Sequence, residues 1–123
     1  MPKPSREGDL VRACLQLLTA RGWLAWRQNA GVLVLPGPAR RAVRMGPAGM
    51  PDILALRKCG PGSLSEVLAI ETKRGDARVT PVQAAMHERL RKENVAVLIV
   101  RDIATLSAWL PLAPASPGPG GKA

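Results

Sequence analysis

Two side chains of opposite charge stand two residues apart in the stretch AIETKRG, residues 69–75. Glu71 closes an apolar run, and Lys73 follows it. If this segment is a strand, its side chains alternate between two faces, so Glu71 and Lys73 project from the same face. Such a pair can be an ordinary surface ion pair. It can also be half of a metal-dependent hydrolytic site, and the rest of the chain bears on that choice.

A second carboxylate belongs to the stretch GMPDILAL, residues 49–56. The patterns of 52–58 and 66–73 predict two strands joined as a hairpin. In that hairpin Asp52 begins one strand and Glu71 ends the next. The two carboxylates are therefore expected to meet at one edge of the sheet.

Carboxylates at one edge suit a divalent metal ion. With the backbone carbonyl of Thr72, Asp52 and Glu71 offer hard oxygen ligands for Mg²⁺ or Mn²⁺, and waters would complete the shell. Such a metal lowers the pKa of a bound water and shields the charge of a phosphate. Lys73 would orient that water and stabilise the charge that develops in the transition state. These residues predict hydrolysis of a phosphate ester.

The surrounding sequence predicts the elements that position these residues. Thr80 can cap a helix with Pro81 at its first position, and VAVLIV is typical of a buried strand. Residues 36–50, rich in Pro, Gly and Arg, are expected to form a loop. Helices are expected at 5–21, 80–92 and 102–110. Strands are expected at 23–29, 52–58, 66–73 and 95–100, with 31–35 either a second strand or the continuation of the first.

This order predicts an α/β fold with a mixed central β-sheet flanked by helices, in the order α-β-β-β-α-β-α. Residues 1–110 would form one domain. The Pro/Gly-rich tail, residues 111–123, has no means of burying itself and is expected to be disordered. No segment approaches the roughly 20 apolar residues of a transmembrane helix, so no membrane partner is expected.

The charge of the chain favours a polyanionic partner. The net charge is +9, and 13 of the 18 basic residues are Arg. Between residues 10 and 51 there are six Arg and no acid. This imbalance is typical of proteins that bind nucleic acid. The residues expected to grip backbone phosphates are Arg40, Arg41 and Arg44 in the loop, and Arg74 and Arg78 after Lys73.

Cysteine and histidine offer little further chemistry. Cys14 and Cys59 lack the spacing of a zinc site or a disulfide framework, so a reducing cytoplasm is the expected compartment. Cys14 fits a helical apolar pattern and is expected in the core. His87, the single histidine of the chain, has no partner by spacing, so we expect no catalytic or ligand role for it.

The motif residues resemble a known family. Pro51-Asp52 followed by Glu71-Thr72-Lys73 is the PD-(D/E)xK pattern of restriction-endonuclease-like nucleases. With WRQNAG, the basic loop, VTPVQ and VAVLIV, the chain resembles the virus-type replication-repair nuclease domain, VRR-NUC, over about residues 5–110. The resemblance implies a Mg²⁺- or Mn²⁺-dependent endonuclease that cuts branched or flapped DNA, four-way junctions included. It also implies a bacterial or phage-infected cell and a homodimer.

The resemblance adds site residues to those found from spacing. It implies that Glu7 completes the metal site, although Asp9 stands two residues away as an alternative. Gln83 matches a glutamine that faces the site from the following helix. Arg27 and Asn29 match a polar strand that precedes the basic loop. The basic loop has its own sequence, which leaves the preferred DNA structure open.

Two other functions compete with this reading. The first is a DNA-binding module of the same fold without catalysis, which has no need to keep Asp52, Glu71 and Lys73 together. The second is a metal-dependent hydrolase of another phosphate or nucleotide substrate. The strong positive charge favours a long polyanion over a small one, because binding to a long polyanion should weaken steeply as salt rises.

Overall fold

The computed structural model of the protein describes residues 7–28, 32–38, 41–44 and 46–110, and within these the side chains of residues 7, 32–34, 43 and 44 fall outside the description. The helices and most strands lie close to their predicted limits. In chain order the elements are α1 (Glu7–Ala20), β1 (Leu24–Arg27), β2 (Val32–Leu35), β3 (Arg41–Arg44), β4 (Ile53–Lys58), β5 (Ser65–Thr72), α2 (Pro81–Lys92), β6 (Ala96–Val100) and α3 (Ile103–Trp109).

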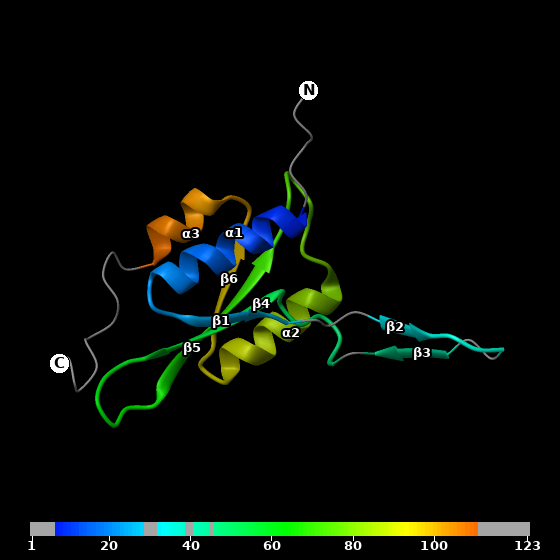
Figure 1. Ribbon diagram of the computed structural model, residues 1–123, viewed down its shortest axis with the longest axis horizontal. Coiled ribbons are helices and arrows are strands. Elements are labelled where there is room, and N and C mark those ends of the chain that lie inside the picture. The colour runs from blue at the N-terminus through cyan, green and yellow to red at the C-terminus, as the bar shows by residue number, and fades with distance from the viewer. Residues whose placement is uncertain (1–6, 29–31, 39–40, 45, 111–123) are drawn as a thin grey trace.

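A four-stranded sheet in the order β1-β4-β5-β6 forms the centre of the molecule. The first three strands are antiparallel, whereas β6 runs parallel to β5 because α2 carries the chain back between them. Helices α1 and α3 cover one face of this sheet, and α2 lies against the other (Figure 1). The predicted mixed α/β domain with a central sheet flanked by helices is confirmed.

The apolar core lies between the sheet and the α1 layer. Val11, Cys14 and Leu18 are spaced three and four residues apart, so they form one stripe of α1, and all three are buried. The stripe belongs to the same cluster as Ile53 on β4 and Leu68 on β5. Because strand side chains alternate, the neighbours of these core residues point toward α2 instead. That second face carries the polar residues considered below.

One part of the predicted order is wrong. Residues 36–50 were expected to be a loop, but they contain β3, which pairs with β2 in a separate two-stranded ribbon. Five strands therefore precede α2, not three. The ribbon extends away from the body (Figure 1), and β2 and β3 contact each other and no other described element. Its second strand is short and bounded by Pro and Gly, which conceals the strand pattern of RAVR.

Burial of Leu68 generates a stability prediction with a matched control. Leu68 on β5 is 0% exposed, whereas Leu64 in the preceding turn is 91% exposed. We expect Leu68→Ala to lower the free energy of unfolding by about 2–5 kcal/mol, through lost burial and the cavity left behind. Leu64→Ala should change it by less than about 0.5 kcal/mol. Urea denaturation followed by circular dichroism measures both, and equal effects would contradict this placement of the core.

Cys14 and Cys59 should differ sharply in reactivity. Burial raises the pKa of the Cys14 thiol to about 11, and the nearby carboxylate of Asp52 adds to this shift. Below that pH the thiol stays protonated and is a poor nucleophile. At pH 8 we expect iodoacetamide to modify exposed Cys59 in the native protein, and to modify both cysteines once guanidinium unfolds the chain. Mass spectrometry of the labelled peptides reads this out; native alkylation of Cys14 at the rate of Cys59 would contradict it.

Candidate functional site

The predicted hairpin is present, and it places two carboxylates at one edge of the sheet. Strands β4 and β5 pair antiparallel with Ile53 opposite Ile70. Continuing this register by one residue puts Asp52, just before β4, opposite Glu71 near the end of β5. The two residues are therefore neighbours across the strands although 19 positions separate them in sequence.

Thr72 holds the carboxylate of Asp52. Its backbone N–H donates to Asp52 Oδ2 at 2.9 Å, and its Oγ1 hydroxyl donates to the same oxygen at 2.7 Å. Two donors on one oxygen fix the direction of the carboxylate. Among the described residues, the other oxygen, Oδ1, accepts no hydrogen bond. The expected role of the Thr72 carbonyl as a metal ligand stays a prediction, whereas its amide and hydroxyl have an orienting role that spacing did not indicate.

Glu71 lies on the α2 face of the sheet and is almost fully buried, with 1% of its surface exposed. Two side chains of α2 meet its carboxylate. His87 Nε2 lies 3.1 Å from Glu71 Oε1, and Gln83 Nε2 donates to Glu71 Oε2 at 3.4 Å. A buried carboxylate without partners would be costly, so these contacts are what allow Glu71 to sit inside the fold.

His87 is buried as a neutral side chain. Burial lowers its pKa, Arg91 and Lys73 lower it further, and Asp52 opposes the shift. The imidazole is therefore uncharged at neutral pH. Because an ionised carboxylate can only accept hydrogen bonds, we place the ring proton on Nε2, which donates to Glu71. Spacing indicated no partner for His87, but the side chain is 2% exposed and packs directly against Glu71. The expectation that His87 has no catalytic or ligand role stays a prediction.

The helical periodicity of α2 is a signal in the sequence from which the position of His87 beside Glu71 could have been predicted. Gln83 and His87 are four residues apart, so they lie on the same face of a helix. Once Gln83 is placed beside Glu71, His87 follows one turn later.

Gln83 joins Lys73 to Glu71. Its Oε1 accepts from Lys73 Nζ at 2.7 Å and from the backbone N–H of Thr80 at 2.9 Å. The Thr80 hydroxyl in turn accepts from the Gln83 backbone N–H at 3.1 Å, which completes a capping box at the start of α2. With its oxygen held by two donors, the amide can point its nitrogen only toward Glu71. The predicted cap at Thr80 thus also orients the site.

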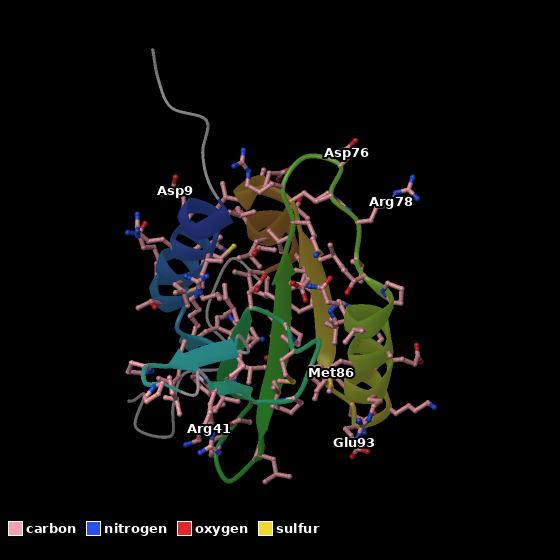
Figure 2. All side chains as sticks on the ribbon, turned by 90° about the vertical axis from the view of Figure 1, so that its right-hand side faces the viewer. Asp9, Arg41, Asp76, Arg78, Met86 and Glu93 are labelled. Atoms are coloured by element: carbon pink, nitrogen blue, oxygen red, sulfur yellow. The ribbon has the colours of Figure 1, made fainter. Side chains whose placement is uncertain are left out.

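Arginine side chains lie on both sides of this site. Arg74 and Arg78 are exposed in the segment between β5 and α2, and Arg41 is exposed on β3. Figure 2 shows Arg78 and Arg41 at opposite ends of the molecule, with the α2 face between them. Arg101 donates from Nη1 to the carbonyls of Gly75 at 2.9 Å and Ala77 at 2.7 Å, so it holds the segment that carries Arg74 and Arg78.

The remaining predicted residues are less fully placed. Arg27 ends β1 and is exposed. Asn29 and Arg40 lie outside the described residues, as do the side chains of Arg44 on β3 and Glu7 on α1. Asp9, the alternative to Glu7, contacts Arg12 at 3.5 Å.

A divalent metal would find two carboxylates here. In the described part of the chain, no group of three or more His, Cys, Asp or Glu side chains is arranged to hold a metal ion. Mg²⁺ commonly uses one or two carboxylates and keeps several waters, so it does not need a third side chain. The carboxylate of Asp52, across the strands from Glu71, fits that chemistry. The long contact between Gln83 and Glu71 is the one that a metal could replace.

Comparisons with known proteins add no relative. A scan against protein-family models finds no match, and searches of curated proteins and of solved structures find none either. Over the described residues, no helix has the length and hydropathy needed to cross a membrane.

The buried pair of His87 and Glu71 generates a stability prediction. We expect His87→Ala to lower the free energy of unfolding by about 3 kcal/mol, because it removes a buried ring and the hydrogen-bond partner of Oε1 in a buried carboxylate. Glu88→Ala, one residue along the same helix but exposed, should change it by less than about 0.5 kcal/mol. Thermal and urea unfolding measure both variants. Similar values for the two would mean that the contact with Glu71 contributes little.

Proposed function

We propose that this protein is a metal-dependent endonuclease of restriction-endonuclease-like fold that hydrolyses phosphodiester bonds in branched or flapped DNA. The observation that carries the proposal is the juxtaposition of Asp52 and Glu71 at one sheet edge, with Lys73 tied to Glu71 through Gln83. An ion pair at the surface would need neither a second carboxylate at the same edge nor the amide that links Lys73 to Glu71. A hydrolytic site uses both, because acid, base and substrate must be held in fixed geometry.

Asp52 and Glu71 would hold Mg²⁺ or Mn²⁺, with the Thr72 carbonyl and Glu7 as the further ligands that the resemblance implies. Such a metal supplies an activated water and offsets the charge of the phosphate. Thr72 keeps the Asp52 carboxylate in one direction, and His87 does the same for Glu71. Ligating groups that are themselves hydrogen-bonded lose less freedom when they bind.

Lys73 acts on the phosphate. Its Nζ is held 2.7 Å from Gln83 Oε1, next to the carboxylates. From there the amino group can donate to a non-bridging phosphate oxygen and stabilise the charge that develops as the bond to the leaving oxygen breaks. The leaving oxygen departs as the free 3′ or 5′ end of the cut strand, and water supplies the oxygen and the proton that complete the two products.

The basic residues would position the DNA without reading its sequence. Arg78 at one end of the α2 face and Arg41 at the other would contact phosphates on both sides of the cut (Figure 2). Arg74, which lines a second hollow with Asp9 and Arg101, would contact the backbone further along. A contact of this kind selects the shape of the duplex and its branches. Arg27, Asn29, Arg40 and Arg44 extend the same surface in this proposal, and a homodimer would present two sites to a four-way junction.

Replacement of Asp52 tests the proposal directly. We expect Asp52→Asn to reduce cleavage by roughly 100-fold or more, because it removes a metal-binding charge. Asp102→Asn is the matched control: it makes the same change at the cap of α3, where asparagine caps as well as aspartate. Both should bind DNA as the wild type does.

The assay uses four labelled substrates, namely a duplex, a flap, a splayed arm and a four-way junction, each with Mg²⁺, Mn²⁺ or EDTA. Cutting that requires metal and is lost only in Asp52→Asn supports the proposal and ranks the substrates. Tight binding of DNA with no cutting under any metal would favour the rival function, a DNA-binding module of the same fold.

A further inference from the structure

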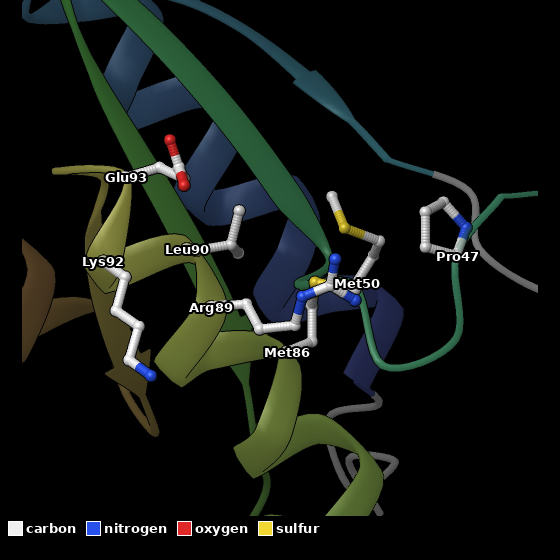
Figure 3. Close-up of a pocket in the computed structure, with 7 residues that line it drawn as sticks. All are labelled: Pro47, Met50, Met86, Arg89, Leu90, Lys92 and Glu93. Carbon is white, nitrogen blue, oxygen red and sulfur yellow. The ribbon is translucent and has the colours of Figure 1, made fainter.

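A hollow of about 520 Å³ lies between α2 and the segment that carries Pro47 and Met50. Its apolar wall consists of Pro47, Met50, Met86 and Leu90. Figure 3 shows Met50 and Met86 close to one another, with Leu90 further along the helix. The volume falls within the roughly 300–1,000 Å³ typical of sites for small organic groups. None of these residues has a part in the hydrolytic site described above.

Gly49 sets the wall of this hollow. Its φ is +81°, and a Cβ at this position would lie 2.4 Å from the carbonyl oxygen of Val82 in the first turn of α2. Glycine therefore lets the chain pack directly against the helix, which brings the adjacent Met50 toward Met86. The hollow is formed by close backbone contact and does not depend on a bound group to shape it.

The rim of the hollow is charged. Arg89 and Lys92 contribute two positive charges and Glu93 one negative charge. The Arg89 guanidinium lies next to Met50 and Met86, whereas Lys92 and Glu93 lie toward the end of α2 (Figure 3). An occupant should therefore combine an apolar flat body with a negative group at the Arg89 side.

The hollow and the hydrolytic site are built from neighbouring residues of the same two segments, although no side chain lines both. Met50 comes two residues before Asp52, and Met86 comes directly before His87. A DNA strand that binds at Asp52 and Glu71 would therefore pass along the two segments that form the hollow.

We propose that the hollow takes one unpaired nucleotide of the DNA substrate, with its base packed against Met50 and Met86 and its phosphate against Arg89. This inference rests on the proposed endonuclease activity and names the feature of the substrate that the site selects. Thioether groups pack well on aromatic rings, and guanidinium binds phosphate with two parallel hydrogen bonds. A paired base remains stacked in the duplex and cannot enter, so a flap or branch provides the ligand.

The side chains that line the hollow also indicate that it does not distinguish one base from another. Its lining side chains offer no neutral hydrogen-bonding group for a base edge. Base faces are all aromatic, and stacking of this kind tolerates any base. The selection is therefore for an unpaired nucleotide at a branch and not for a sequence.

The test compares flap substrates that differ at the first unpaired position, which carries either a normal base or an abasic analogue. Binding is measured by fluorescence anisotropy in the Asp52→Asn background, and cleavage in the otherwise native protein. We expect removal of the base to weaken binding about tenfold, the scale of one stacked base. Met86→Gln should erase this difference, and Met86→Leu, which keeps an apolar side chain, should retain it.

Arg89→Gln should weaken binding of both flaps, while Arg12→Gln, which removes the same charge from α1 on the opposite face, should not. Thermal unfolding establishes that each variant is folded. Equal binding of base-containing and abasic flaps, or an unaltered base preference in Met86→Gln, overturns the inference even if cleavage is normal. Free deoxyadenosine monophosphate that binds as tightly as the flap also overturns it, because the hollow would then be a small-molecule site.

The two proposals can fail separately. If no metal supports cleavage but the base preference persists and depends on Met86, the endonuclease proposal falls and the nucleotide site stands. If cleavage depends on Asp52 and is indifferent to the unpaired base, the endonuclease stands and the nucleotide site falls.

Discussion

The buried carboxylate of Glu71 is the constraint on which the rest of the site depends. A buried carboxylate needs hydrogen-bond partners in the protein. Lys73 follows Glu71 on the same face of the chain, but the hydrogen bonds of its amine link it to Glu71 through Gln83. The partners come from α2, which must therefore lie at one rotation about its axis and one position along β5. A shift of α2 by one residue would remove both Gln83 and His87 from the carboxylate.

This requirement explains why Gln83 and His87, two polar side chains that contact Glu71, lie one turn apart on α2. The side-chain amide of Gln83 accepts hydrogen bonds from the Thr80 N–H at the start of α2 and from Lys73 Nζ, and it donates one to the carboxylate of Glu71. Because the Gln83 amide has three hydrogen-bond partners, its orientation is fixed, and this in turn fixes the positions of Lys73 Nζ and the Glu71 carboxylate. Groups held this way need little rearrangement when a substrate arrives, which is the general physical basis of efficient catalysis.

The sequence predicts this arrangement unevenly, and the reasons are physical. The hairpin of β4 and β5 and the cap at Thr80 follow from local rules, alternation and capping, that act over a few residues. The contact between His87 and Glu71 joins residues 16 positions apart through a crossover, and no local rule encodes it. Strand β3 was missed for a different reason. Two short strands that pair only with each other leave a weak pattern, and the Pro and Gly around them point to a loop.

The parallel pairing of β5 with β6 has a consequence for how the site comes into being. The antiparallel hairpin joins Asp52 and Glu71 through a short connection, so their meeting is a local event in folding. Lys73, Gln83 and His87 take their places only when the chain has returned through α2 and Lys73 N–H bonds the Val100 carbonyl at 3.0 Å. Closing that longer loop costs more entropy and comes later. In a partly folded chain, Asp52 and Glu71 would already be neighbours but would lack the side chains that orient them. The site would therefore become complete only when the whole domain has folded.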